Sequence, residues 1–426
     1  MEIVTCPDVY VSGNNVDDTA VKVSSVTDAG DISYWLNDGS GSLTPAGADS
    51  THYNVKYEEK TRMLTLRNAA ITKYYYDDAL YGIHAADDLQ IVLEGDSQIG
   101  VVPTGEDFDT PAFGIHCDGN LTVSTTDGGT LDVYAKGNGL DTDDSIQLKG
   151  GTISISAAQI GIMSNDDVTV SGNNTSLRIE AGSASSSDAF YGIMADGKVT
   201  IADAALDIEK KGITGDAVRS NDDICIYGDT NVKIVDWSSG DASGKCGLHS
   251  DKGSVSIGEA AKVDICSQHA GIFARQNLYI GYVPAGSDFV VSGDPTVKIN
   301  DTGSINAITP EITDDFVPGG FGLAAENDLY FADGTVDVFA MYSGNDDGYG
   351  ICATEDGTIH ILGGTVAAEA TGGGYSGGIV AVEGSIDISG GAVEAVGSYC
   401  ALYCDDGILT LPTTAYKYKS STTASD

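Results

Sequence analysis

Acidic side chains recur in this chain shortly after small-aliphatic pairs such as Gly82-Ile83 and Gly139-Leu140. If successive repeats stack, these carboxylates form a ridge, and two of them about 5 Å apart repel by roughly 1 kcal/mol in water. Calcium takes about six to eight oxygen ligands and would relieve that repulsion. The predicted calcium ligands are Asp87, Asp88, Asp118, Asp143, Asp144, Asp166, Asp167, Asp222 and Asp223. The alternative is a set of solvated turns, because Asp, Asn and Gly are favoured in β-turns.

The residue after each aliphatic anchor forms a second stripe. Strand side chains alternate between faces, so the anchor points inward and the next residue points outward. The candidate sugar-binding residues on this stripe are His84, His116, Asp141, Arg219 and His249. Their side chains can hydrogen-bond to hydroxyl groups, and Tyr75 could stack on a sugar ring. The alternative is an ordinary exposed sheet face. The aromatic residues just before anchors, by the same parity, are expected to point inward as corner packing; they include Tyr81, Phe113, Phe321 and Tyr349.

These stripes depend on a regular repeat. Twelve small-aliphatic pairs begin at Gly82, Gly114, Gly139, Gly161, Gly192, Ala217, Gly247, Gly271, Gly322, Gly350, Gly378 and Ala401. Two residues after each aliphatic anchor the side chain is small, as in Ala85 and Thr142. Two further alternating runs follow, often joined by Gly-Gly-Thr. Three short strands per repeat predict an all-β fold, a single right-handed three-sheet parallel β-helix of about twelve to fourteen turns with an N-terminal cap.

The repeat also suggests the domain organisation. We expect residues 1–70 to form the N-terminal cap and opening turn, because an open end would expose unpaired strand edges. Residues 71–411 form the β-helix, continuous with the cap, and residues 412–426 form a Thr/Ser-rich tail or linker. The long interval from Gly271 to Gly322 indicates an inserted loop or a lost anchor.

Composition limits the partners. The formal net charge is -42, which repels nucleic acid and anionic membranes. No apolar run approaches the roughly 18 residues of a membrane span, so we expect neither nucleic-acid binding nor membrane insertion. The opening residues MEIVTCPDVYV lack the pattern of a signal peptide.

Eight cysteines could suggest disulfides, but the repeat places them where they do not pair. Cys400 and Cys404 lie on one predicted strand roughly 13 Å apart, and a disulfide needs Cα atoms within about 7 Å. We predict mostly free, buried thiols. A zinc site is disfavoured, because His116 and the adjacent Cys117 face opposite sides of a strand and no ligand set has the usual spacing.

The segment from Tyr53-Asn54-Val55-Lys56-Tyr57 through Leu64-Thr65-Leu66 to Tyr81-Gly82-Ile83 resembles the opening of carbohydrate-binding domain-containing proteins of clostridia. Residues 50–411 share that family's Gly-Ile, Asp-Asp and Gly-Gly-Thr rhythm. The resemblance implies a calcium-binding, pectate-lyase-like β-helix at the cell surface or outside the cell. It also implies binding of plant polysaccharide such as cellulose or polygalacturonate, by what we expect to be a monomeric module of a larger surface protein.

Catalysis is the less favoured alternative. A polysaccharide lyase on this fold would use a Lys or Arg base, and the candidates are Lys198 and Arg219, but neither lies in a recognisable lyase motif. The pair Asp143-Asp144 alone is weak evidence for hydrolysis. A second alternative is a surface adhesin or spacer without sugar affinity.

Overall fold

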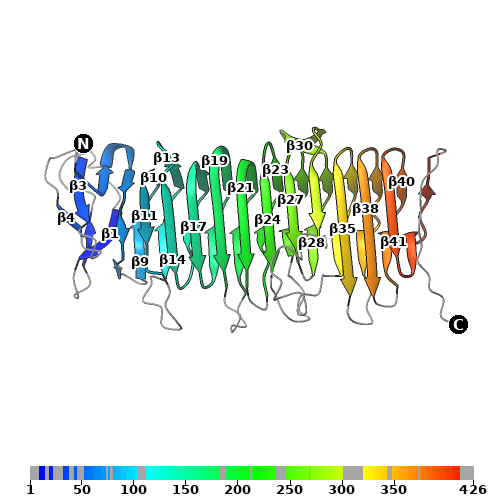
Figure 1. Ribbon diagram of the computed structural model, residues 1–426, viewed down its shortest axis with the longest axis horizontal. Coiled ribbons are helices and arrows are strands. Elements are labelled where there is room, and N and C mark those ends of the chain that lie inside the picture. The colour runs from blue at the N-terminus through cyan, green and yellow to red at the C-terminus, as the bar shows by residue number, and fades with distance from the viewer. Residues whose placement is uncertain are drawn as a thin grey trace, which may run out of the picture. The chain divides into compact units, whose positions relative to one another are not determined.

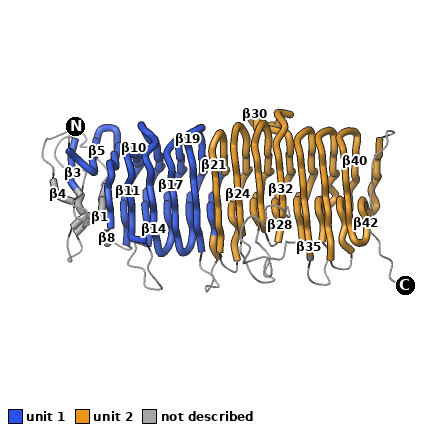
Figure 2. The backbone as a smooth tube through the Cα atoms, in the orientation of Figure 1, with its two compact units in different colours: residues 1–183, 191–197 blue, residues 184–190, 198–426 orange. Residues whose placement is uncertain are grey.

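The computed structural model of the chain describes residues 9–14, 19–22, 32–37, 43–45, 52–72, 75–76, 80–102, 112–182, 189–211, 214–236, 246–267, 269–300, 320–342, 348–372 and 375–412. These residues form β-strands and a single short 3-10 helix, Glu59–Thr61. They divide between two compact units (Figure 2): unit 1 holds residues 1–183 and 191–197, and unit 2 holds residues 184–190 and 198–426. No helix in the described part of the chain is long and apolar enough to cross a membrane.

Unit 1 contains the first twenty strands. They are β1 (Val9–Asn14), β2 (Thr19–Lys22), β3 (Ile32–Asn37), β4 (Leu43–Pro45), β5 (Val55–Glu58), β6 (Met63–Arg67), β7 (Ala70–Ile71), β8 (Tyr75–Tyr76), β9 (Leu80–Ala85), β10 (Leu89–Glu94), β11 (Asp96–Ile99), β12 (Phe113–Cys117), β13 (Leu121–Thr125), β14 (Thr130–Ala135), β15 (Leu140–Thr142), β16 (Ile146–Lys149), β17 (Gly151–Ala157), β18 (Ile160–Ser164), β19 (Val168–Ala181) and β20 (Tyr191–Ala195).

Unit 2 contains the remaining strands. They are β21 (Val199–Lys210), β22 (Val218–Ser220), β23 (Ile224–Tyr227), β24 (Asn231–Asp236), β25 (Cys246–Ser250), β26 (Val255–Ile257), β27 (Lys262–Cys266), β28 (Ala270–Ala274), β29 (Leu278–Ile280), β30 (Tyr282–Ala285), β31 (Asp288–Val291), β32 (Thr296–Ile299), β33 (Phe321–Ala325), β34 (Leu329–Phe331), β35 (Thr335–Tyr342), β36 (Tyr349–Ala353), β37 (Ile359–Ile361), β38 (Thr365–Gly372), β39 (Gly377–Ala381), β40 (Ile386–Ile388), β41 (Ala392–Gly397), β42 (Cys400–Cys404) and β43 (Leu409–Thr410).

The strands of each unit stack in parallel columns, as the sequence repeat predicts (Figure 1). In unit 1 the first column runs β9, β12, β15, β18 and β20, and the aliphatic anchors are aligned from Ile83 to Ile193. The first column of unit 2 runs β22, β25, β28, β33, β36, β39 and β42. The anchors from Ile83 to Ile379 are fully buried, and so are small residues two positions later such as Ala85 and Ser220, whereas Leu402 on β42 is only half-buried. The parallel β-helix is therefore confirmed.

The turn count differs from the prediction. The coil has about 10 turns instead of twelve to fourteen. Unit 1 has four complete turns, the last formed by β18 and the single long strand β19, and unit 2 has six. Two of the twelve small-aliphatic pairs do not begin a complete turn within one unit. β20 is the last strand of unit 1, and β42 is followed only by the two-residue strand β43. The second and third columns form one continuous sheet, because the long strand β19 pairs with both β16 and β17, and β21 pairs with both β23 and β24.

In most of the small-aliphatic pairs a glycine marks a corner of the coil. A Cβ atom at Gly82 would lie 2.4 Å from Cγ2 of Ile99 and 2.5 Å from the backbone oxygen of Gly114. A Cβ atom at Gly139 would meet Ile155 and the backbone of Gly161 in the same way. The glycine therefore faces the interior together with the anchor that follows it, and the alternation of sides is broken at this point.

That break corrects two sequence expectations. The aromatic residues before the anchors lie on the outer face: Tyr81 and Phe113 pack against His84 and His116. In unit 2 the outward residues Ala324, Cys352 and Val380 are buried by a cluster that includes Phe273, Phe321, Tyr349 and Val382. The outer face of this column is therefore partly a second hydrophobic layer rather than a uniformly solvated surface.

Antiparallel strand pairs occur in the predicted N-terminal cap and in the long interval between Gly271 and Gly322. β5 pairs antiparallel with β3 and β6, and β1 pairs antiparallel with β9. An antiparallel hairpin of β30 and β31 occupies part of the interval after Gly271. The predicted boundaries at residues 70 and 411 stay predictions, and the tail beyond Pro412 lies outside the described residues.

Candidate functional site

His116 in unit 1 lies between two carboxylates. Its Nδ1 donates a hydrogen bond to Oδ1 of Asp141 at 2.8 Å, and its Nε2 lies 3.2 Å from Oδ1 of Asp118. The register of β12 with β15 places His116 directly beside Asp141. Asn138, which is buried, donates to the other oxygen of Asp141. The carboxylate of Asp141 is therefore held on both oxygens and fixes the orientation of the imidazole.

Burial of His116 opposes its charged form, but the hydrogen bond and negative charge of Asp141, with Asp118 and Asp143, raise the pKa of His116 above its ordinary value. The side chain of His116 is only 16% exposed, whereas that of Asp118 is 44% exposed. The pair thus has one partly buried end and one solvent-accessible end.

Aromatic rings surround these polar groups. The rings of His84 and His116 stack with centroids 5.5 Å apart and planes only 3° from parallel. Tyr81 stacks on Phe113 at 5.3 Å, and both contact His116. Nε2 of His84 also lies 3.5 Å from Oδ1 of Asp118. The structure therefore brings together three predicted sugar-binding residues, His84, His116 and Asp141, with one predicted calcium ligand, Asp118.

Unit 2 contains a second network of the same kind. Asp216, which is fully buried, accepts hydrogen bonds from Nδ1 of His249 at 2.9 Å and from the backbone N–H of Cys246 at 2.8 Å. Nε2 of His249 lies 3.2 Å from Oδ1 of Asp251. Arg219 donates through Nε and Nη2 to Oδ2 of Asp251 at 2.8 and 2.6 Å. The network therefore links a buried carboxylate to a guanidinium group that is 33% exposed.

The two networks share a local sequence signature. His116 and His249 each lie two residues before an aspartate that directly follows the strand. Each histidine is also aligned with a basic side chain of the preceding turn, His84 or Arg219. The sequence stripe identified the basic residues and histidines but missed Asp216 and Asp251 as their partners. The His-x-Asp spacing, repeated at one point of the coil, was the available signal.

Several acidic residues at the turns make hydrogen bonds between turns. Oδ1 of Asp88 accepts from the backbone N–H and from Nδ2 of Asn120, both at 2.9 Å. Oδ1 of Asp223 accepts from the backbone N–H of Ser254 at 2.9 Å. These contacts explain why acidic or amide side chains recur at this point of the repeat without reference to a metal.

The other predicted calcium ligands lie in different surroundings. Asp87 pairs with Arg62 at 2.8 Å, and Asp166 accepts a hydrogen bond from the hydroxyl of Ser145. The exposed carboxylates include Asp143, Asp144, Asp166, Asp167 and Asp222. Among the described residues, two groups of three His, Cys, Asp or Glu side chains have ligand atoms within 4.8 Å of one another, and both groups contain histidine. Calcium binding at the turns stays a prediction.

Sequence reasoning missed an aromatic column in unit 2. Tyr279 stacks on Tyr330 at 5.1 Å, Tyr330 stacks on His360 at 4.8 Å, and Phe289 of β31 stacks on Tyr279 at 4.5 Å. Burial and a hydrogen bond to Asp328 raise the pKa of the Tyr330 hydroxyl. Because these rings cover one another, the column offers mainly edges and hydroxyl groups to a ligand.

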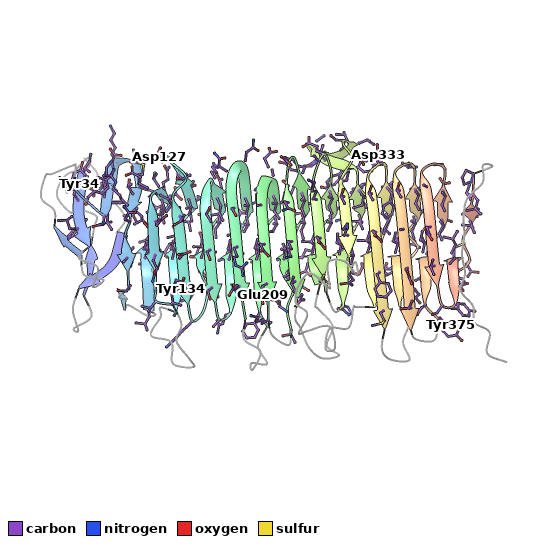
Figure 3. The ribbon with its side chains drawn as sticks, in the orientation of Figure 1. Tyr34, Asp127, Tyr134, Glu209, Asp333 and Tyr375 are labelled. Atoms are coloured by element: carbon purple, nitrogen blue, oxygen red, sulfur yellow. The ribbon has the colours of Figure 1, made fainter. Side chains whose placement is uncertain are left out.

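Exposed tyrosines lie at one end of unit 2. Tyr375, which is labelled in Figure 3, is 59% exposed, and Tyr399 and Tyr403 are 51% and 41% exposed. The rings of Tyr375 and Tyr399 meet edge-to-face at 4.8 Å. The predicted stacking residue Tyr75 is on β8, but its side chain lies outside the described part of the structure.

The fold and these surfaces define a parallel β-solenoid with polar and aromatic side chains displayed along its outer face. The chain belongs to the carbohydrate-binding domain-containing protein family, whose model matches residues 23–374. This match confirms the resemblance seen in the sequence. The comparisons with curated proteins and with solved structures gave no match.

Proposed function

We propose that this protein is a non-catalytic carbohydrate-binding module that recognises polysaccharide through the Arg219–Asp251–His249 network of unit 2. The observation that supports this site is the ordered chain of contacts from buried Asp216 through His249 and Asp251 to Arg219. The family match supports the general role.

Such a network suits sugar hydroxyl groups. Arginine offers several donors in one plane, and a carboxylate offers several acceptor positions, so the pair can bind adjacent hydroxyls. Asp251 is 20% exposed and Arg219 33% exposed, which leaves part of each group accessible to a ligand. Groups that are already oriented lose less conformational entropy when they bind. The ring of Phe273 packs edge-on against His249 at 5.3 Å and adds an apolar contact beside the network.

The acidic charge of the protein bears on the choice of polysaccharide. With a net charge of -42, the chain would bind a uronate polymer such as polygalacturonate only with a cation between the carboxylates. We propose calcium for this role, recruited by exposed turn residues such as Asp143, Asp144 and Asp222. A neutral, cellulose-like polymer would need no such bridge. For either polysaccharide, we propose that the protein acts at the cell surface or outside the cell, as a module of a larger protein.

The alternative of a uronate lyase has less support. A lysine or arginine that acts as the base of a lyase must be neutral before it can take the C5 proton of the substrate, so a lowered pKa favours this role. Although burial favours the neutral form of Lys198, the neighbouring Cys225 and Asp223 outweigh it and raise the pKa of Lys198. Nζ of Lys198 is paired with Asp223 at 3.3 Å, and Arg219 is paired with Asp251. Both candidate bases are therefore stabilised as cations.

The test is a glycan array followed by calorimetric titration with the best oligosaccharide, with calcium and with chelator. Removing a hydrogen bond to a charged group costs about 1.5–3 kcal/mol, so Arg219→Ala is expected to weaken binding roughly 10- to 100-fold. Arg178→Ala is the matched control, because Arg178 also pairs with a carboxylate, Glu180 at 2.6 Å, on β19 of unit 1. Equal losses in both variants, or no glycan bound, would reject the site. Formation of unsaturated, ultraviolet-absorbing product would favour the lyase.

A further inference from the structure

Three side chains from two adjacent turns converge on the outer face of unit 1. His84 on β9 and His116 on β12 are aligned by the parallel register, and Asp118 directly follows β12. The ligand-type atoms of the three residues all lie within 4.8 Å of one another. Oδ1 of Asp118 lies 3.2 Å from Nε2 of His116 and 3.5 Å from Nε2 of His84.

These separations match a metal coordination sphere. Zinc bonds to imidazole nitrogen and carboxylate oxygen are about 2.0–2.2 Å long, so neighbouring ligand atoms of a tetrahedral site are about 3.3–3.5 Å apart. The two nitrogen–oxygen distances fall close to that range. The histidine rings are parallel within 3°, with centroids 5.5 Å apart, so a tilt of the rings toward each other would bring the two Nε2 atoms to a similar separation.

A further residue orients one of the histidines. Asp141 accepts the Nδ1 proton of His116, which leaves Nε2 of the neutral ring as the atom that faces Asp118 and His84. Asn138 in turn holds Asp141 through its other oxygen. A carboxylate that accepts from the non-coordinating nitrogen is the common arrangement behind histidine ligands of zinc.

The donor set selects the class of metal. Two imidazoles and one carboxylate suit zinc and related transition metals, whereas calcium requires oxygen ligands. The 44% exposed side chain of Asp118 provides an entry path and room for water as a further ligand. The second group, Asp216, Cys246 and His249, lacks this access, because Asp216 and Cys246 are 0% and 3% exposed.

We infer that His84, His116 and Asp118 bind a Zn²⁺ ion, with water as the fourth ligand and Asp141 as a positioning residue for His116. The ligands come from successive turns of the coil, so the site depends on the stacking of the turns and not on a short sequence motif.

The test uses tag-free full-length protein dialysed against chelator. Zinc is titrated in the presence of a chromophoric chelator, and cobalt is titrated while its visible absorption is recorded. The expected result is one zinc per chain and the intense bands of tetrahedral cobalt. His84→Ala and His116→Ala are each expected to weaken zinc binding by more than about 100-fold, and Asp141→Asn by roughly 10- to 100-fold with one zinc still bound.

Two further variants serve as controls. His249→Ala removes the equivalent histidine of the other network, and Asp222→Asn removes an exposed turn carboxylate of unit 2; both are expected to leave zinc affinity unchanged. Thermal melting without metal identifies any variant that fails to fold, and for such a position His→Gln replaces His→Ala. The inference is wrong if zinc does not bind, if both His84 and His116 variants bind normally, or if the loss occurs in His249→Ala instead.

Discussion

Asp216 accepts a hydrogen bond from Nδ1 of His249 at 2.9 Å, and the carboxylate is completely buried. The other oxygen of this carboxylate, Oδ1, accepts a hydrogen bond from the backbone N–H of Cys246. One buried side chain therefore orients the surface network and satisfies the first residue of β25. His116 and Asp141 have the equivalent relationship in unit 1, at 2.8 Å.

Replacement of Asp216 by alanine is expected to destabilise unit 2 by about 2–3 kcal/mol. The change leaves the buried N–H of Cys246 without its acceptor, and leaving a buried donor unsatisfied costs about 1–3 kcal/mol. Urea unfolding followed by circular dichroism measures the change. Asp222→Asn, on the exposed turn, is the control and should shift stability by less than about 0.5 kcal/mol. Equal effects would show that Asp216 has no special structural role.

Replacement of Gly139 by alanine is expected to cost about 3 kcal/mol or more. The new Cβ would lie 2.6 Å from the backbone oxygen of Gly161, which no side-chain rotation can relieve. Gly128→Ala is the comparison, since its Cβ meets nothing within 4 Å and only its positive φ of 77° opposes the change. That variant should lose about 1–2 kcal/mol. Urea midpoints of the two proteins decide whether corner sterics require the glycine.

The fold was predictable because the repeat has two independent markers. A small side chain such as Ala85 or Thr142 leaves room inside the coil, and glycines such as Gly82 turn its corner. The corner residue and the small inward residue each keep a fixed position in the repeat, so the pattern can be recognised even where the rest of the repeat changes. Parity failed only at the corner itself, where two consecutive residues face inward and Tyr81 is therefore directed outward.

The site was only partly predictable. The alignment of His84, His116 and Asp141 followed from the stripe, because parallel register stacks equal positions. The direction of the Asp118 carboxylate could not be predicted from the stripe, because Asp118 lies after the end of the strand and the backbone of the turn determines where its side chain points. The same limit applies to Asp216, which precedes its strand and whose burial depends on neighbouring turns.

Asp88 is expected to contribute to the loss of stability in acid. The hydrogen bonds from the backbone and side chain of Asn120, with the charge of Arg62, hold the pKa of Asp88 below its ordinary value despite some burial. A group with a lowered folded pKa stabilises the protein fully above its unfolded pKa, near 3.8, and this contribution is lost as pH falls through the folded pKa.

Urea unfolding between about pH 6 and pH 2 tests this contribution. Asp88→Asn should make stability fall less steeply with acid than in the wild type. In an Asn120→Ala background, where the hydrogen bond from Nδ2 is missing, the same replacement should change the slope less. An unchanged slope in Asp88→Asn would show that this carboxylate is not linked to folding.

Thiol reactivity should follow the position of each cysteine in the coil. The described cysteines form no disulfide, which confirms the prediction of free thiols, and those buried are Cys117, Cys225, Cys246, Cys266 and Cys352. Burial raises the pKa of Cys117 to about 12, and its thiol donates to the backbone oxygen of Asp87 at 2.9 Å. Because the thiolate is the reactive form, Cys117 should resist alkylation in the native protein at pH 8.

Cys400 and Cys404 on β42 are partly exposed and should be modified first. Timed alkylation followed by peptide mass spectrometry measures the order, with guanidinium-unfolded protein as the control in which all eight cysteines react. Native labelling of Cys117 as fast as that of Cys404 would mean that the inward position opens readily to solvent. Slow labelling of the buried thiols would instead show that the stacked turns stay closed on the timescale of the reaction, because the thiol must leave the interior before it can ionise.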